Sequence, residues 1–430
     1  MKTILTFSEK LGIFLKKGMK TIAFVLIWYS CRRFYIKIQG NGAMNIGIFT
    51  DTYLPETNGV AVSTKILKDE FAKLGHNAYI ITTSNPHRKH AEDGVFTLPS
   101  MPLVFTSSRR LGTLYSNRVR RIIKRLNLEI VHTHTEFSIG LFGKINAFAL
   151  KIPVVHTYHT IYRDYGHYLK IARFKKLTGG MAKTMTKTYC TGCKAIIAPT
   201  KKTYNLLDDY GLKNEKHIIP TGINLSKFDE GSTCAEEIAG LKKTHGIDDN
   251  ETVLLNVGRV AKEKSIDVII RAFPGILEKN PGVKLVIVGD GPALHGLISL
   301  CRELGVSENV VFTGEIPWAK IAAYYRIGDV FISASKSETQ GLTFIEAMAS
   351  GLPVISIRDE CLEGIIEDKE TGYIFDDEND LPELVSCVMN DEDLRLRISQ
   401  NALLTAQRFS CENYAKNVLK VYKSVLKNEV

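Results

Sequence analysis

The sequence has few of the features that mark secreted or membrane-spanning proteins. It holds only 8 cysteines in 430 residues, too few and too scattered for a disulfide framework, which indicates a reducing compartment such as the cytosol. It contains no apolar run of about 18 residues or more, which argues against a polytopic membrane protein. Because 44% of the residues are hydrophobic and 24% are charged, we expect a folded chain. At about 100 to 200 residues per domain, its 430 residues predict two or three domains.

Positive charge is concentrated in the front part of the chain. The net charge of +10 divides into +7 for residues 1–43, +14 for 44–225 and −11 for 226–430. This imbalance predicts an anionic partner for the front part, either a membrane surface or a nucleic acid. Because no RNA- or DNA-binding motif accompanies the charge, we expect an anionic membrane surface and no nucleic acid.

Residues 1–43 form a basic N-terminal extension with an apolar run over 22–31. The run is about half the length of a spanning helix, which favours an interfacial segment. A secretory signal is a competing interpretation. A third is a dispensable extension ahead of Met44.

From Met44 onward, β-rich runs alternate with amphipathic helices, the pattern of parallel βαβ units. The pattern predicts an α/β fold with one Rossmann-like domain over 44–224, a second over 225–409 and a C-terminal helix over 410–430. One possible path for this last helix crosses back to the first domain. The expected strands are 46–52, 78–83, 129–135, 152–160, 195–200 and 217–222 in the first domain, and 252–259, 284–289, 310–313, 329–333 and 353–357 in the second.

The most specific motif covers residues 335–354, where a loop containing Gly341 leads from a strand into a helix. The free N–H groups and the dipole of that helix start attract an anion. Glu346, about one turn into the helix, has a carboxylate that can accept hydrogen bonds from vicinal hydroxyls such as those of a ribose. Glu338, in the loop, is placed to reach a sugar. The motif therefore predicts a site for a sugar nucleotide.

Two further turns support this prediction. Arg259 follows a buried strand, and Lys264 comes five residues later, so two cations are available to neutralise a diphosphate leaving group. Asp290 lies between two glycines at the end of another strand, where open α/β sheets bind ligands. No D-x-D pair stands where a metal-dependent transferase would place it, and four strand-end histidines lack the ligands that would complete a zinc site. We therefore expect no metal and no cofactor besides the nucleotide-sugar substrate.

With these motifs, the second half resembles retaining glycosyltransferase family 4, whose GT-B architecture has two Rossmann-like domains facing across a cleft. The resemblance covers about Met44 to the C-terminus. It implies a nucleotide-sugar donor whose diphosphate binds Arg259 and Lys264, whose ribose binds Glu346 and whose sugar binds Glu338. The other donor-binding positions that it implies are Gly258, Asp290, Thr313, Gly314, Ile316, Gly341, Leu342 and Thr343.

The first half, through segments 49–60, 131–140 and 153–160, is similar to a narrower group, the bacterial 1,2-diacylglycerol 3-glucosyltransferases. That similarity implies transfer of glucose from UDP-glucose to diacylglycerol with retention, by a cytoplasmic enzyme peripheral to the inner face of the cell membrane. It also implies that His159 contacts the transferred sugar, that Gly59 lets the backbone approach the donor phosphates, and that Glu136 lies near the acceptor. His134 stands where that group is expected to have Gln.

Alternative acceptors are phosphatidylinositol and a soluble or polyprenyl-linked glycan. Outside enzymes, the alternative is a sugar-nucleotide-binding protein without catalysis.

Residues 107–126 interleave cations with apolar residues at spacings of three and four. One interpretation is a basic amphipathic stretch on an anionic leaflet, where each cation contributes about 1 kcal/mol. The other is a helix whose apolar stripe packs on the sheet while its charges are solvated. The candidate acceptor or membrane cations are Arg109, Arg110, Arg118, Arg121, Lys124 and Arg125.

Overall fold

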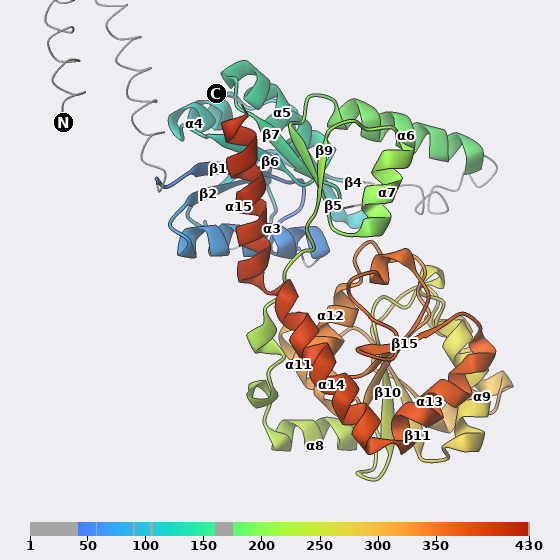
Figure 1. Ribbon diagram of the computed structural model, residues 1–430. Coiled ribbons are helices and arrows are strands. Elements are labelled where there is room, and N and C mark those ends of the chain that lie inside the picture. The colour runs from blue at the N-terminus through green and yellow to red at the C-terminus, as the bar shows by residue number, and fades with distance from the viewer. Residues whose placement is uncertain (1–41, 57, 89–90, 104–105, 160–174, 429–430) are drawn as a thin grey trace, which may run out of the picture. The chain divides into compact units, whose positions relative to one another are not determined.

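The computed structural model describes residues 42–56, 58–88, 91–103, 106–159 and 175–428 (Figure 1). Its contacts separate Met1–Met44 from one compact unit, Asn45–Val430. The predictions for the N-terminal extension therefore lie almost wholly outside the described residues, and the description below concerns the second unit.

The N-terminal lobe is built on a parallel seven-stranded sheet in the order β3-β2-β1-β6-β7-β8-β9. Strands β6, β7 and β8 are buried along their whole length, as expected for parallel strands covered by helices on both faces. The strands are β1 (Asn45–Phe49), β2 (Asn77–Thr83), β3 (Val95–Leu98), β6 (Ile130–Thr133), β7 (Val154–Thr157), β8 (Ala195–Ala198) and β9 (Glu215–Ile218). The helices are α3 (Gly59–Lys73), α4 (Asn117–Arg125), α5 (Ser138–Leu150), α6 (Lys175–Cys190) and α7 (Lys201–Asp209).

The C-terminal lobe repeats this plan on a parallel six-stranded sheet in the order β12-β11-β10-β13-β14-β15. Its strands are β10 (Thr252–Val257), β11 (Val283–Val288), β12 (Val310–Phe312), β13 (Val330–Ser333), β14 (Val354–Ile357) and β15 (Gly372–Phe375). Its helices are α8 (Ala235–Thr244), α9 (Ile266–Lys279), α10 (Leu294–Glu303), α11 (Ile321–Ile327), α12 (Leu342–Ala349), α13 (Leu381–Asn390) and α14 (Glu392–Ala406). The predicted α/β fold with two Rossmann-like domains is confirmed.

The last helix, α15 (Cys411–Lys427), returns to the N-terminal lobe and packs against α3 (Figure 1). Two buried tyrosines anchor it there: the Tyr422 hydroxyl lies 2.6 Å from His132 Nδ1, and the Tyr414 hydroxyl lies 2.8 Å from Ser63 Oγ. A Cβ atom on Gly222 would lie 2.8 Å from the Cα of Cys411. The return of the chain therefore needs a glycine at that crossing.

The prediction of one continuous amphipathic stretch over 107–126 is wrong in its first part. Residues Thr106–Gly112 form strand β5, which pairs antiparallel with β4 (Ser100–Leu103). The helix α4 begins only at Asn117, because the Ser116 side chain caps it by accepting from the amide of Val119. Strands β3 and β15 and the β4–β5 hairpin were not predicted, and the strand expected at 217–222 lies at Glu215–Ile218.

The apolar stripe of α4 is turned inward. Val119 and Ile123 are buried in the same hydrophobic cluster as Ile139 and Phe142 of α5. The second interpretation of this stripe, packing on the protein core, is therefore correct. Four cations of α4 remain on the exposed side of the helix: Arg118, Arg121, Lys124 and Arg125.

Candidate active site

The loop 335–341 connects β13 to α12 and carries Glu338 near its middle. Gly341 ends the loop with φ +70°, and a Cβ atom there would lie 2.6 Å from Phe344 Cδ2, so only glycine fits. The helix that follows has no side-chain cap at Gly341. The amides of Leu342 and Thr343, in its first turn, are consequently placed to bind an anion.

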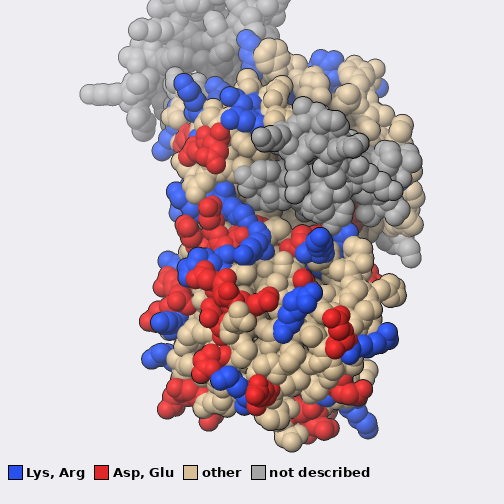
Figure 2. Space-filling view, turned by 90° about the vertical axis from the view of Figure 1, so that its right-hand side faces the viewer, with Lys and Arg blue, Asp and Glu red and all other residues tan. Residues whose placement is uncertain are grey.

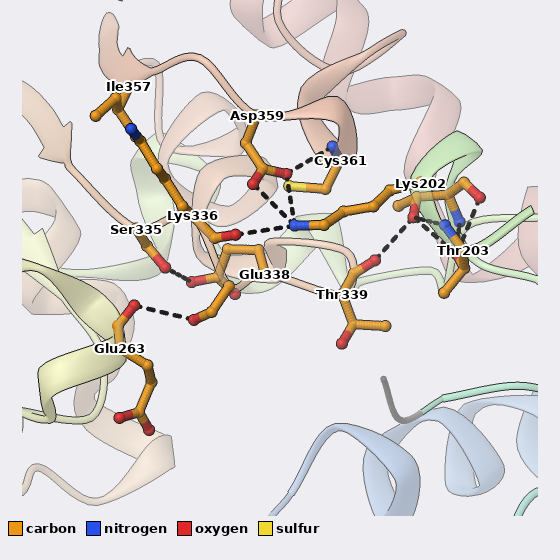
Figure 3. Close-up of polar contacts among 12 residues, drawn as sticks. Lys202, Thr203, Glu263, Ser335, Lys336, Glu338, Thr339, Ile357, Asp359 and Cys361 are labelled. Atoms are coloured by element: carbon orange, nitrogen blue, oxygen red, sulfur yellow. Dashed lines mark hydrogen bonds and ion pairs between the residues drawn. The ribbon is translucent and has the colours of Figure 1, made fainter. Parts of the chain in front are cut away.

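Both predicted diphosphate-binding cations face a carboxylate. Lys264, in the short 3-10 helix Lys262–Lys264 after β10, is ion-paired with Glu338. The Ser335 hydroxyl donates to the same Glu338 oxygen over 2.9 Å (Figure 3). Arg259 Nη1 lies 3.9 Å from Glu263 Oε1, and half of the Arg259 side chain is exposed. The site therefore holds its positive charge beside acidic groups that an incoming anion can replace.

Glycine turns meet at the carboxyl ends of β10, β11 and β12. The amide of Gly258 donates to the carbonyl of Val288 over 3.0 Å, and that of Gly289 donates to the carbonyl of Gly314 over 3.0 Å. A Cβ atom on Gly289 would lie 2.0 Å from the Gly258 oxygen, which explains the glycine. Asp290 is exposed at this junction, and Thr313 and Ile316, on either side of Gly314, are half-buried.

Glu346 is buried one turn inside α12. The Tyr325 hydroxyl donates to its Oε2 over 2.8 Å. Burial raises the pKa of Glu346 to about 7, although this hydrogen bond and the charge of Lys227 act in the opposite direction. The carboxylate that is predicted to bind the ribose therefore has a pKa close to neutral pH.

Sequence reasoning missed the neighbours of Glu346. Burial lowers the pKa of Lys227 to about 8, and its ammonium stands 3.7 Å from the ring centroid of Trp318. Trp318 is 44% exposed and follows Ile316 by two residues. The chain has only two tryptophans, and Trp318 lies close to the residues that are predicted to bind the base. This position is the signal that could have indicated an aromatic side chain beside them.

Four histidines lie at the carboxyl ends of β6 and β7. His134 Nδ1 lies 2.9 Å from His159 Nε2, and His156 Nε2 lies 3.3 Å from Glu136 Oε1. The Glu136 side chain is only 3% exposed, so it is turned inward to His156. Within the described part of the chain, no group of three or more His, Cys, Asp or Glu residues is arranged to hold a metal ion.

Gly59 brings the N-terminal lobe to the end of the loop 335–341. It begins α3, which is capped by the Asn58 side chain accepting from the Ala61 amide over 3.0 Å. A Cβ atom on Gly59 would lie 3.9 Å from Leu342 Cδ1. The starts of α3 and α12 are therefore neighbours, whereas the roles of Gly59 and Leu342 in donor binding stay predictions.

Further contacts fix the loop 335–341 to the N-terminal lobe and to the segment that follows β9. The Gln340 carboxamide is buried and makes two hydrogen bonds of 2.9 Å with the backbone N–H and C=O of Thr221. Lys202 donates to the Lys336 carbonyl over 2.9 Å and is ion-paired with Asp359 at 2.8 Å (Figure 3). The sequence did not identify Gln340 or Lys202 as loop anchors, because their partners are far away in the chain.

The predicted membrane cations do not form one group. Arg110 is tied to the β4–β5 hairpin by hydrogen bonds to the Ser100 hydroxyl and carbonyl, whereas the cations of α4 are exposed. The side chain of Arg109 lies outside the described residues. In the described part of the chain, no helix has the length and apolar character to cross a membrane.

The fold, with a Rossmann-like parallel sheet in each lobe, is that of the GT-B glycosyltransferases. Residues 57–227 match the model of Glycosyltransferase Family 4, and residues 238–405 match that of Glycosyl transferases group 1. The solved structure of Anabaena HepE in complex with UDP superposes with a TM-score of 0.70 at 17% identity, covering 89% of this chain and 100% of that one.

Curated relatives extend the agreement over most of the sequence. The chain is 39% identical to the alpha-monoglucosyldiacylglycerol synthase of Streptococcus pneumoniae, over 88% of this chain and 85% of that protein. It is 35% identical to the protein of the same name from Acholeplasma laidlawii, over 89% of this chain and 98% of that protein. The chain therefore belongs to glycosyltransferase family 4, and it is a glycosyltransferase.

Proposed function

We propose that the protein transfers glucose from UDP-glucose to the 3-hydroxyl of diacylglycerol with retention at the anomeric carbon. The names of its relatives in Streptococcus pneumoniae and Acholeplasma laidlawii support the lipid acceptor and the glucosyl group. The observation that carries the proposal is the meeting of Lys264, Glu338 and the uncapped start of α12 at one loop. This arrangement offers a cation and amides to a diphosphate and a carboxylate to sugar hydroxyls.

In the proposed mechanism, the acceptor attacks the front face of the donor sugar. As the glycosyl bond breaks, Arg259, Lys264 and the amides after Gly341 stabilise the negative charge that develops on the diphosphate. The departing phosphate oxygen takes the proton of the acceptor hydroxyl. No protein nucleophile forms a covalent intermediate, and the two cations supply the charge neutralisation for which other transferases use a metal ion.

The remaining residues of the proposed site hold the donor. Glu346 accepts hydrogen bonds from the ribose hydroxyls, and the base lies near Thr313, Gly314 and Ile316. His159 contacts the glucose from the N-terminal lobe. Because Gly59 lies beside Leu342, the backbone of that lobe also reaches the donor phosphates.

We also propose that the N-terminal lobe attaches to an anionic membrane surface. The exposed cations of α4 supply the charge. The apolar contribution comes from α5, where Leu141, Ile145 and Phe148 follow one another at spacings of four and three and are 40%, 52% and 90% exposed. On the face drawn in Figure 2, acidic side chains are spread over the C-terminal lobe among basic ones, which makes that lobe a poorer partner for anionic lipid.

A panel of nucleotide sugars, assayed with diacylglycerol vesicles and read by product mass and anomeric configuration, tests the proposal. We expect α-glucosyldiacylglycerol from UDP-glucose. Transfer only to phosphatidylinositol or to a glycan would show that the proposed acceptor is wrong. Binding of UDP-glucose without any turnover would support a non-catalytic binding protein instead.

A further inference from the structure

His134, which is buried, and His159, which is half-buried, form a pair after two neighbouring strands. His134 directly follows β6, and His159 follows β7 by two residues. Their rings are stacked with centroids 5.1 Å apart and an interplanar angle of 23°. His134 Nδ1 lies 2.9 Å from His159 Nε2, so the two rings share one hydrogen bond.

Both imidazoles are neutral at physiological pH. Burial lowers the pKa of His159 to about 3, and burial together with the neighbouring histidines lowers the pKa of His134 well below its ordinary value. A neutral imidazole carries one proton on one of its two nitrogens. The shared hydrogen bond therefore has two possible arrangements, in which either His134 or His159 is the donor.

The second nitrogen of His134 distinguishes the two arrangements. His134 Nε2 is buried and has no hydrogen-bond partner among the described residues. If His159 donated to His134 Nδ1, His134 would carry its proton on Nε2 and bury an N–H group without an acceptor. If His134 donates, its buried Nε2 carries only a lone pair without a partner, and the remaining N–H lies on the half-buried His159. Buried N–H groups without acceptors are the rarer defect, so His134 is the donor.

We propose that His134 is a positioning residue that fixes the tautomer of His159. With its Nε2 accepting from His134, His159 carries its proton on Nδ1, for which no described residue provides an acceptor. His159 thus presents an N–H donor to an oxygen of the transferred sugar. This inference rests on the proposed function, in which His159 contacts the glucose.

The proton positions can be measured directly by 15N NMR of protein labelled at histidine, with the His159 signals assigned by their loss in His159→Gln. We expect a protonated Nδ1 and an unprotonated Nε2 for His159 in the wild type. A wild-type His159 protonated on Nε2 overturns the proposal, whether or not any variant folds.

Two variants of similar size separate donation from packing. In His134→Gln the carboxamide N–H can still donate to His159, so we expect the wild-type tautomer and kcat/KM for UDP-glucose within about threefold of wild type. In His134→Leu the donor is lost, so we expect a mixture of tautomers and kcat/KM lowered about tenfold, the equivalent of one hydrogen bond. An unchanged tautomer and unchanged kinetics in His134→Leu would overturn the assignment.

The sugar contact is tested separately by titration. UDP-glucose should shift the His159 Nδ1 signal and UDP alone should not. Equal shifts with both ligands would overturn the sugar contact. Absence of glucosyl transfer together with the expected tautomer would instead contradict the proposed function and leave the tautomer assignment standing.

Discussion

Lys264 and Glu338 are ion-paired across the neighbouring strands β10 and β13. In the proposed mechanism the two side chains bind different parts of the donor: Lys264 binds the diphosphate, and Glu338 binds the glucose hydroxyls. Donor binding must therefore separate the pair. A phosphate then replaces Glu338 as the partner of Lys264, and glucose hydroxyls replace Lys264 as the partner of Glu338. The pair compensates both charges while the site holds no donor.

Replacing Glu338 with Gln should affect UDP and UDP-glucose in opposite ways. Without the competing carboxylate, Lys264 is freed for the diphosphate, so we expect UDP to bind several-fold more tightly by calorimetry. Because the sugar loses its carboxylate partner, kcat with UDP-glucose should fall about 100-fold. Glu278→Gln, an exposed change on α9, is the control. Weaker UDP binding in Glu338→Gln would show that the pair does not compete with the donor.

Replacing Lys264 with Ala should lower kcat about 100- to 1,000-fold, the usual effect of removing one group that stabilises transition-state charge. Binding to lipid vesicles should be unchanged. The matched control is Lys262→Ala, two residues earlier in the same 3-10 helix and exposed, which should retain full activity. Turnover of Lys264→Ala at the wild-type rate would remove this residue from the leaving-group site.

Donor affinity should depend on pH through Glu346. Its pKa is raised to about 7, so it is mostly protonated at pH 6 and mostly ionised at pH 8. The ionised form is the better acceptor for ribose hydroxyls, and KM for the donor should therefore fall as the pH rises over this range. In Glu346→Gln this dependence should be absent and KM should be higher. A KM independent of pH in the wild type contradicts the assignment of Glu346 to the ribose.

The amide of Gln340 should contribute to stability and to donor binding together. In Gln340→Leu, the backbone N–H and C=O of Thr221 lose their partners, at about 1–3 kcal/mol for each buried group left unpaired. We expect a lower midpoint in urea and a higher KM for the donor, because the loop that carries Glu338 is no longer fixed. Gln407→Leu, an exposed change, should do neither. Normal stability in Gln340→Leu would contradict the role of this anchor.

Membrane attachment should depend on both α4 and α5. At low salt, reversing the charge of Arg118, Arg121 and Arg125 to Glu should abolish co-sedimentation with anionic vesicles. At high salt the difference between this variant and the wild type should be smaller, because wild-type binding is also weak there. Phe148→Ser with Ile145→Ser should weaken binding at every salt concentration. The control reverses Arg271, Lys320 and Lys369 in the C-terminal lobe. Unchanged binding in both α4 and α5 variants rejects this surface.

The sequence predicted the parts of this molecule that depend on local pattern. Runs of Val, Ile and Leu identified β10, β11 and β13, and glycines marked the turns that follow them. The β4–β5 hairpin was missed because the three-residue spacing of Leu111 and Leu114 fits a helix. Leu111 instead belongs to β5, which ends at Gly112 and is fixed by pairing with residues 100–103.

The contacts that define the site depend on residues far apart in the chain. Gln340 binds Thr221, 119 positions away, and Glu338 binds Lys264, 74 positions away. Tyr325 lies 21 positions before Glu346, on another helix. No local pattern reports such partners, so the sequence could predict Glu338, Glu346 and Lys264 as site residues but not the partners that each of them contacts.

The most direct measurement is a crystal structure of the complex with UDP-glucose. The account predicts that Lys264 Nζ lies about 3 Å from a diphosphate oxygen, the distance of a charge-assisted hydrogen bond, with Glu338 moved onto a glucose hydroxyl. A complex in which Lys264 stays on Glu338 while the diphosphate binds elsewhere would contradict it.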